Sequence, residues 1–208
     1  MTPEDQSQPQ PPLPLAYAPR SDADSFVISV SNRDAVGWLA EPARWPMPRC
    51  VLIGPSGAGK SHLATLFHAR HGGVLAEDAD CAADGEALFH AWNAATEAAP
   101  LLITARRLPR FWAHRLPDLA SRLAATPLVT IADPDDALVT ALLAKQFADR
   151  GLKVGEDVLA YLSLRIERSF ANAAAIVERL DAMALAERRD LTVPLARECL
   201  EGQLRLAL

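Results

Sequence analysis

The chain has 208 residues, half of them apolar, and a formal net charge of -5. This is enough for one compact α/β domain with a small appendage. The acidic balance argues against a broad basic surface for nucleic acid, because phosphate neutralisation supplies most non-specific affinity, so any DNA contact is expected to be indirect. No apolar run is long enough to span a membrane and no signal peptide pattern is present, so we expect a cytoplasmic protein without a membrane partner.

The chain divides into three regions by composition. Residues 1–20 are rich in Pro and Gln and are expected to form a flexible tail. Residues 21–134 contain a short apolar segment at 26–32, a helical pattern at 34–39 and then alternating strand and helix signals. The predicted strands are 50–53, 73–76, 101–104 and 128–131, and the helices between them are 60–69, 84–95 and 116–124. This order predicts a mostly parallel sheet covered by helices on both faces.

Residues 135–208 show only helical spacing. Apolar residues recur with a helical period over 135–150, 156–168, 170–188 and 194–206. We therefore expect a small all-helical domain, in which the Ala-rich faces pack as a bundle.

A phosphate-binding loop follows the first strand of the predicted sheet. Its eight residues are Gly54, Pro55, Ser56, Gly57, Ala58, Gly59, Lys60 and Ser61. In this pattern the glycines let successive N–H groups point into one concavity, and the start of the next helix adds its positive dipole end. Lys60 is expected to pair with the β and γ phosphates of a nucleotide and the Ser61 hydroxyl to hold Mg²⁺.

The acidic residues of the site are expected at the end of the second strand. Glu77 occupies the place of a magnesium-supporting carboxylate and Asp78 that of a water-activating acid, although an acidic strand end facing solvent fits the pattern equally well. Only one helix and a turn separate the loop from this strand. The sheet is therefore expected to be trimmed by one edge strand relative to many proteins with such a loop.

Three segments together resemble the AAA+ module of DnaA-related proteins. They are 57–63, 101–106 and 116–123, and they are most similar to the Hda family, whose members lack the DNA-binding domain of the initiator DnaA. The resemblance extends from Gln10 to Leu200. It implies an AAA+ module with a helical lid domain at 135–208, an adenine nucleotide, ADP or ATP, at the loop, and a regulatory role in replication initiation.

The tail contributes a second motif to this resemblance. Gln10, Leu13, Pro14 and Leu15 look like the motif by which Hda proteins dock on the replicative sliding clamp, the β subunit of the DNA polymerase. An extended, Pro-stiffened segment can place its two leucines in an apolar pocket at reduced ordering cost. Taken alone, the same residues fit an inert tail or a ligand of proline-binding modules.

By resemblance, Arg122 matches the family's arginine finger, which reaches a nucleotide held by another subunit. Such a residue supplied in trans accelerates phosphoryl transfer on the order of a thousandfold or more. From the residues alone, Arg122 is interpreted as an exposed helical arginine in a salt bridge. The arginines at 106, 107, 110 and 115 are assigned to that structural role.

Further positions carry family roles by resemblance. Asn32 matches the region near the adenine, with Phe26 beside it, or else caps the helix that follows. His62 belongs to the loop segment, and Thr104 takes the sensor position near the γ-phosphate. One position departs from the family: Ala171 stands where DnaA-type proteins carry a second sensing arginine, which leaves Arg168 or nothing in that role.

The function implied by the resemblance is a DnaA regulatory inactivator. It binds the clamp, holds an adenine nucleotide, and promotes hydrolysis of the ATP on DnaA through Arg122, with self-association as a further possibility. Because of Glu77 and Ala171, we expect weak or no ATPase activity of its own. The alternatives are a DnaA paralogue that acts like a helicase loader, which would bind a replicative helicase, and a small P-loop kinase, which would need an acceptor pocket.

Overall fold

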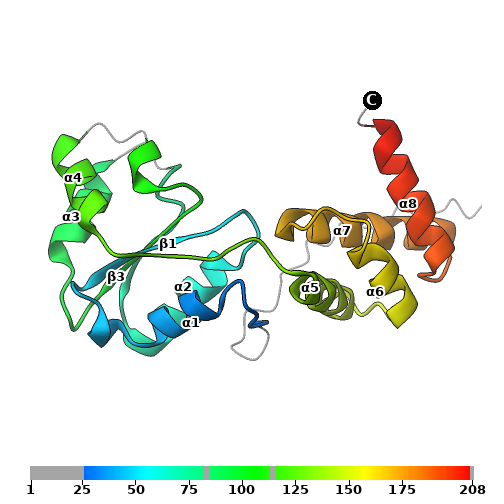
Figure 1. The fold of residues 1–208 in the computed structure, drawn as a ribbon, viewed down its shortest axis with the longest axis horizontal. Helices are drawn as coiled ribbons and strands as arrows, with labels where there is room; N and C mark the ends of the chain where they lie inside the picture. Colours follow the sequence, from blue (N-terminus) through cyan, green and yellow to red (C-terminus); the bar gives the residue numbers. More distant parts are fainter. Residues whose placement is uncertain (1–25, 82–84, 113–115, 207–208) are drawn as a thin grey trace, which may run out of the picture.

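The computed structural model describes residues 26–81, 85–112 and 116–206. An α/β domain occupies one end of the molecule and a group of helices the other, joined by the chain segment before α5 (Figure 1). The first domain contains α1 (Arg33–Ala40), β1 (Arg49–Ile53), α2 (Lys60–His71), β2 (Val74–Ala76), α3 (Gly85–Ala94), β3 (Leu101–Ala105), α4 (Pro117–Ala125) and β4 (Leu128–Thr130). Short 3₁₀ turns lie at Pro42–Arg44 and Pro109–Phe111.

The described strands form one parallel sheet in the order β2-β3-β1-β4. The central pair is in register from Arg49 opposite Leu101 to Ile53 opposite Ala105, and β2 has β3 as its single neighbour. All five residues of β3 are buried, whereas the edge strands β2 and β4 are partly exposed. This confirms the predicted parallel sheet and its trimmed edge.

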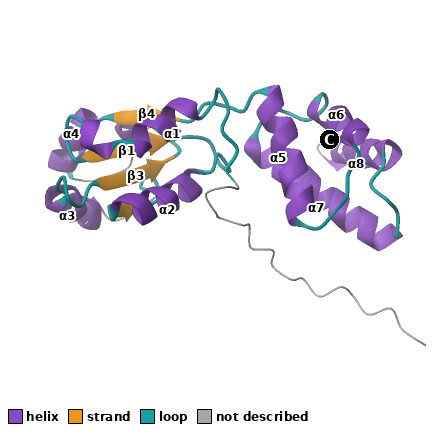
Figure 2. Cartoon of the chain, turned by 90° about the horizontal axis from the view of Figure 1, so that it is seen from below, coloured by secondary structure: helices purple, strands orange, loops and turns teal. Residues whose placement is uncertain are grey.

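Helices cover both faces of the sheet because side chains alternate along each strand. Cys50 and Leu52 pack with α1 and α2, while Val51 and Ile53 pack with α3 and α4. Figure 2 shows the sheet between these helices, with the second domain set apart from them. The sheet is therefore the middle layer of three, and the carboxyl ends of its strands face the helical domain.

The second domain consists of α5 (Asp136–Asp149), α6 (Glu156–Ser163), α7 (Phe170–Glu187) and α8 (Val193–Leu206). Its core is built from buried side chains of all four helices, which include Leu143, Leu162, Val177 and Cys199. The Asp135 carboxylate caps α5 by accepting a hydrogen bond from the Leu138 N–H at 2.7 Å, and the Ser169 hydroxyl caps α7 by accepting from the Asn172 N–H at 3.0 Å.

One helix ends earlier than predicted. The helical spacing extended α6 to residue 168, but α6 ends at Ser163, and residues 164–168 form the connection to α7. The cap at Ser169 starts a new helix and takes extended backbone angles, which a continuous helix could not accommodate. Leu164, the first residue of this connection, is 79% exposed.

Within the described residues, no helix combines the length and the apolar character needed to cross a bilayer.

Candidate functional site

The loop between β1 and α2 has the geometry of an anion cradle. Gly57 and Gly59 have φ angles of 78° and 80°, which side chains rarely tolerate, and α2 begins immediately afterwards at Lys60. The Gly54 N–H donates to the Ala105 carbonyl at 3.2 Å, which ties the start of the loop to β3. The N–H groups of Gly57 and Gly59 find no backbone acceptor among the described residues, so they are available to an anion at the helix start.

Lys60 lies folded against this loop. Its side-chain Nζ donates hydrogen bonds to the carbonyls of Gly54 and Pro55, both at 2.9 Å, and the residue is only 7% exposed. Burial lowers the pKa of this ammonium group, and the nearby Arg106 lowers it further, while Asp78 and Asp80 oppose the shift. A partly desolvated cation that is hydrogen-bonded only to neutral carbonyls is stabilised when a negatively charged phosphate binds beside it.

These features fit a nucleotide polyphosphate. The loop supplies N–H donors, a cation and the dipole of α2, and Ser61 is exposed in the first turn of that helix. Mg²⁺ and phosphates would share their charge with this cradle when bound, and Ser61 is the residue that would hold the metal. All eight predicted loop residues, from Gly54 to Ser61, lie in this one connection, in which Ala58 is buried and Ser56 is exposed.

The segment before α1 forms one wall of the loop. A Cβ atom built on Gly59 would lie 2.8 Å from the Phe26 ring, and that ring meets the His62 ring edge-on with centroids 5.3 Å apart. Asn32 is 2% exposed and shapes the segment: its Oδ1 accepts from the Ser29 N–H at 2.9 Å, and its Nδ2 donates to the Val27 carbonyl at 2.8 Å. Asn32 takes the N-cap position of α1, but its side chain does not cap the helix.

The acidic segment after β2 forms a turn, and its first two carboxylates face solvent. Glu77 and Asp78 are exposed, and Asp78 has a φ of 47°. The Thr104 hydroxyl, buried at 1% exposure, accepts a hydrogen bond from the Asp78 N–H at 3.1 Å. Thr104 therefore holds the acidic turn, and the metal role of Glu77 and the water-activating role of Asp78 stay predictions.

The sequence analysis did not single out Asp80, and it assigned Arg106 to a surface salt bridge. The Asp80 carboxylate, whose side chain is 2% exposed, accepts from the Arg106 N–H at 3.2 Å and lies 3.6 Å from the Arg107 Nε. Arg106 directly follows β3 beside the start of the loop, close enough to affect Lys60. The position of Arg106 in the sequence could have indicated it, because Arg106 is the first charged residue after β3, the central strand that pairs with β1.

The first turn of α7 closes over the loop from the helical domain. A Cβ atom built on Gly57 would lie 3.0 Å from the Cβ of Phe170 and 3.5 Å from the backbone nitrogen of Ala171. Position 171 is thus beside the phosphate loop, where an arginine could reach a bound phosphate, yet Ala171 carries no charge. Arg168 is engaged elsewhere, since its guanidinium pairs with the Asp136 carboxylate at 2.6 and 2.9 Å.

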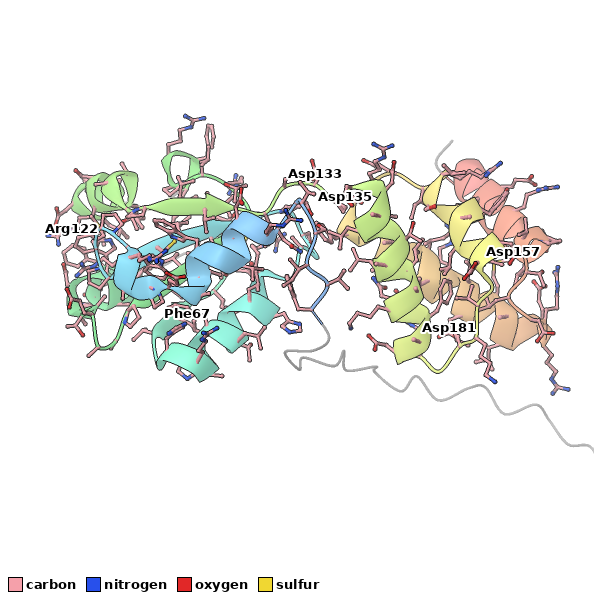
Figure 3. All side chains as sticks on the ribbon, turned by 60° about the horizontal axis from the view of Figure 1, so that its bottom comes forward. Phe67, Arg122, Asp133, Asp135, Asp157 and Asp181 are labelled. Atoms are coloured by element: carbon pink, nitrogen blue, oxygen red, sulfur yellow. The ribbon has the colours of Figure 1, made fainter. Side chains whose placement is uncertain are left out.

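Arg122 lies at the other end of the α/β domain. Figure 3 shows it far from Asp133 and Asp135, which mark the connection to the helical domain. Its guanidinium carbon is 5.0 Å from the centroid of the Trp92 ring, and the same ring carries Arg49, the first residue of β1, at 4.1 Å. The loop follows the last residue of β1, about 13 Å further along the strand. The side chain is 32% exposed and is not enclosed in the core.

The clamp motif of Gln10, Leu13, Pro14 and Leu15 lies outside the described residues.

The fold is shared with several solved replication and recombination proteins. Domain III of the Thermotoga maritima replication initiation protein DnaA superposes with a TM-score of 0.72 at 15% identity, covering 90% of this chain and 98% of that one. AMPPCP-bound DnaA from Aquifex aeolicus gives 0.60 at 15% identity, covering 83% and 69%. The Thermotoga maritima RuvB Holliday junction branch migration motor gives 0.65 at 12% identity, covering 88% and 72%.

The helical domain matches a known family. Residues 135–200 match the family model described as "Hda, lid domain". The helical domain of the chain is therefore an Hda lid domain. The described part of the chain has the AAA+ fold, with a parallel four-stranded sheet followed by this lid.

The loop at 54–61 and the first turn of the lid helix α7 face each other in this fold. The AMPPCP-bound DnaA has the same fold. The lid match also argues against a small-molecule kinase, for which this domain would have to supply an acceptor pocket.

Proposed function

We propose that this protein is an Hda-family DnaA regulatory inactivator that acts in the bacterial cytoplasm. Its tail binds the sliding clamp through Gln10, Leu13, Pro14 and Leu15, its loop at 54–61 holds ADP or ATP with Mg²⁺, and Arg122 promotes hydrolysis of the ATP bound to DnaA. Initiation of chromosome replication is thereby repressed.

The observation that carries the proposal is the position of Arg122. It lies at the amino end of the sheet, while the chain's own phosphate loop lies at the carboxyl end beside the lid. A guanidinium there does not reach its own nucleotide but, being partly exposed, can be presented to the nucleotide of a second molecule. Arginine fingers supplied in trans act in this way on developing phosphoryl charge.

Two features of the site favour a regulatory over a motor role. Ala171 places no charge at the point where the lid meets the loop, and Arg168 is bound to Asp136. The chain's own residues thus bind and orient a nucleotide through Lys60 and the loop amides, but the lid contributes no cation to its hydrolysis. Weak turnover by the protein itself follows from this arrangement.

The test uses purified DnaA loaded with labelled ATP, clamp loaded on DNA, and the full-length protein. Arg122→Ala is expected to reduce hydrolysis of the DnaA-bound ATP on the order of a thousandfold. Arg110→Ala is the matched control, since Arg110 is an arginine of the same domain that stacks on Phe111 instead. Full activity of Arg122→Ala would refute the proposed function.

The clamp is tested separately by pull-down. The double variant Leu13→Ala, Leu15→Ala is expected to lose the clamp while retaining ADP binding, because the two sites are in different regions of the chain. Retention on a replicative helicase in place of the clamp would indicate a helicase loader.

A further inference from the structure

Side chains from two helices surround the guanidinium of Arg122. The Asp118 Oδ2 accepts a hydrogen bond from its Nε at 3.1 Å and forms an ion pair with its Nη2 at 2.9 Å, and the Asn93 Oδ1 accepts a hydrogen bond from its Nη1. The ring centroids of Phe89 and Trp92 each lie 5.0 Å from the guanidinium carbon. Asn93, Phe89 and Trp92 belong to α3, and Asp118 belongs to α4 with Arg122 itself.

This arrangement leaves part of the guanidinium available. An arginine has five N–H donors, and its hydrogen bonds to the described residues occupy one donor on Nε and one on Nη1. The remaining donors are on Nη1 and Nη2, the two nitrogens that can bind two oxygens of one phosphate. The residues that hold Arg122 therefore fix its plane without using all of its donors.

Holding the side chain has an energetic consequence. A free arginine has many accessible rotamers, and it loses this entropy when it is fixed on a phosphate. A guanidinium already fixed by neighbours loses less of this entropy in the transition state. Preorganised donors also require no rearrangement at the moment of reaction.

Asn93 and Asp118 do not contribute equally. Asp118 lies on the same helix as Arg122, four residues earlier, and its negative charge offsets part of the positive charge offered to a phosphate. Asn93 comes from the neighbouring helix, is neutral and exposed, and holds Nη1 without reducing the charge. The distance between the two helices is set independently of Asn93, because the Trp92 Nε1 donates to the Thr126 Oγ1 at 3.0 Å and this hydroxyl donates to the Arg122 carbonyl at 2.8 Å.

We propose that Asn93 is a positioning residue that holds Arg122 in the orientation in which it contacts the ATP of DnaA. The proposal rests on the proposed function of Arg122 and adds a residue on a separate helix. Asn93 does not touch the nucleotide. It acts through Arg122 alone.

The experiment measures hydrolysis of DnaA-bound ATP as the concentration of the full-length, clamp-bound protein is varied. Asn93→Ala is expected to lower the maximal rate by about tenfold, the equivalent of one lost hydrogen bond to a charged group, and to leave the half-saturating concentration unchanged. Asn93→Asp keeps the acceptor oxygen but adds a negative charge, so its rate is expected to lie between those of Asn93→Ala and the parent. The melting temperatures of both variants should equal that of the parent, because Asn93 is exposed.

The controls separate this proposal from the proposed function. Glu97→Gln changes an exposed polar residue just beyond α3 and should leave the rate unchanged. If Arg122→Ala is inactive but Asn93→Ala keeps the parent's rate, the positioning role is refuted while the function of Arg122 stands. A faster Asn93→Ala would also refute it, because Asn93 would then restrain Arg122 away from its target. An active Arg122→Ala would overturn both.

Discussion

At the residue scale, Lys60 combines a buried position with incomplete charge compensation. Its pKa is lowered by burial and by Arg106, and Asp78 opposes the shift. A bound polyphosphate brings negative charge to the ammonium and raises its pKa again. Nucleotide binding therefore takes up protons at alkaline pH, in the window between the lowered and the raised pKa, and affinity falls as the pH rises through the lowered value.

This prediction can be measured by titration calorimetry of ADP binding in alkaline buffers with different ionisation enthalpies. The parent protein should show net proton uptake. Lys60→Arg keeps a positive charge that does not titrate in this range, so it should show less uptake at the same pH. Binding without any proton uptake in the parent would contradict the assignment of Lys60 as the phosphate partner.

Several of the site residues could be predicted from sequence because they are contiguous. Gly57, Gly59 and Lys60 follow a buried strand and start a helix, and local chain geometry alone fixes their relation. Asp80 was not singled out because the conformation of the turn after β2 decides which of its carboxylates is buried. Asp78 has left-handed backbone angles, which change the side chain that points inward. A left-handed residue leaves no periodic pattern in the sequence from which it could be predicted.

At the element scale, the loop and helix α7 meet at one glycine. Gly57 has φ 78°, and an added Cβ would lie 3.0 Å from the Cβ of Phe170. Gly72 has φ 66° at the end of α2, with open space around it, and is a matched control. Gly72→Ala should cost about 1 kcal/mol of unfolding free energy for the backbone conformation alone.

We expect Gly57→Ala to have two further effects. The clash with Phe170 adds to the backbone cost, so its unfolding free energy should fall by more than that of Gly72→Ala. Displacement of α7 from the loop should also weaken ADP binding, which Gly72→Ala should leave intact. Denaturant unfolding and calorimetry measure the two quantities. Equal effects of the two substitutions would show that the lid does not press on the loop.

The helices and strands could largely be predicted from the sequence, but some of their first and last residues could not. Strand β3 was predicted at 101–104 and extends to Ala105 in the structure. It could be predicted because a buried strand is visible in the sequence as a continuous apolar run. Helix α6 was extended too far, because the apolar spacing continues through Ile166, which packs on the lid core from a turn. The contact between Phe170 and Gly57 joins residues more than a hundred positions apart, which periodicity within a segment cannot report.

At the scale of the whole molecule, two cores are linked by few side chains. The lid has its own buried cluster, whereas Phe170, the first residue of α7, packs with the cluster beneath α1 and α2. Leu138 of α5 joins the same cluster. We expect the ordering of the loop by a nucleotide to reach the first turn of α7 through Phe170, and the Arg122 end of the sheet to be unaffected.

Hydrogen exchange tests this coupling. In the parent protein, ADP should slow amide exchange in the first turn of α2 and in the first turn of α7. Phe170→Ala should preserve the effect at α2 and abolish it at α7, because the side chain that joins the two segments is gone. Exchange in α3 and α4, around Arg122, should be unaffected by ADP in both proteins.

The control for this experiment is Leu180→Ala, a substitution in the same helix. Leu180 is 1% exposed in the lid core, so its truncation should cost about 2–5 kcal/mol, a loss comparable to that of Phe170→Ala. It removes no contact with the loop, and the ADP effect at the start of α7 should persist. If Phe170→Ala and Leu180→Ala behaved alike, general loss of lid stability would explain the result. A difference between them would mean that the bound nucleotide acts on the first turn of α7 through the Phe170 side chain.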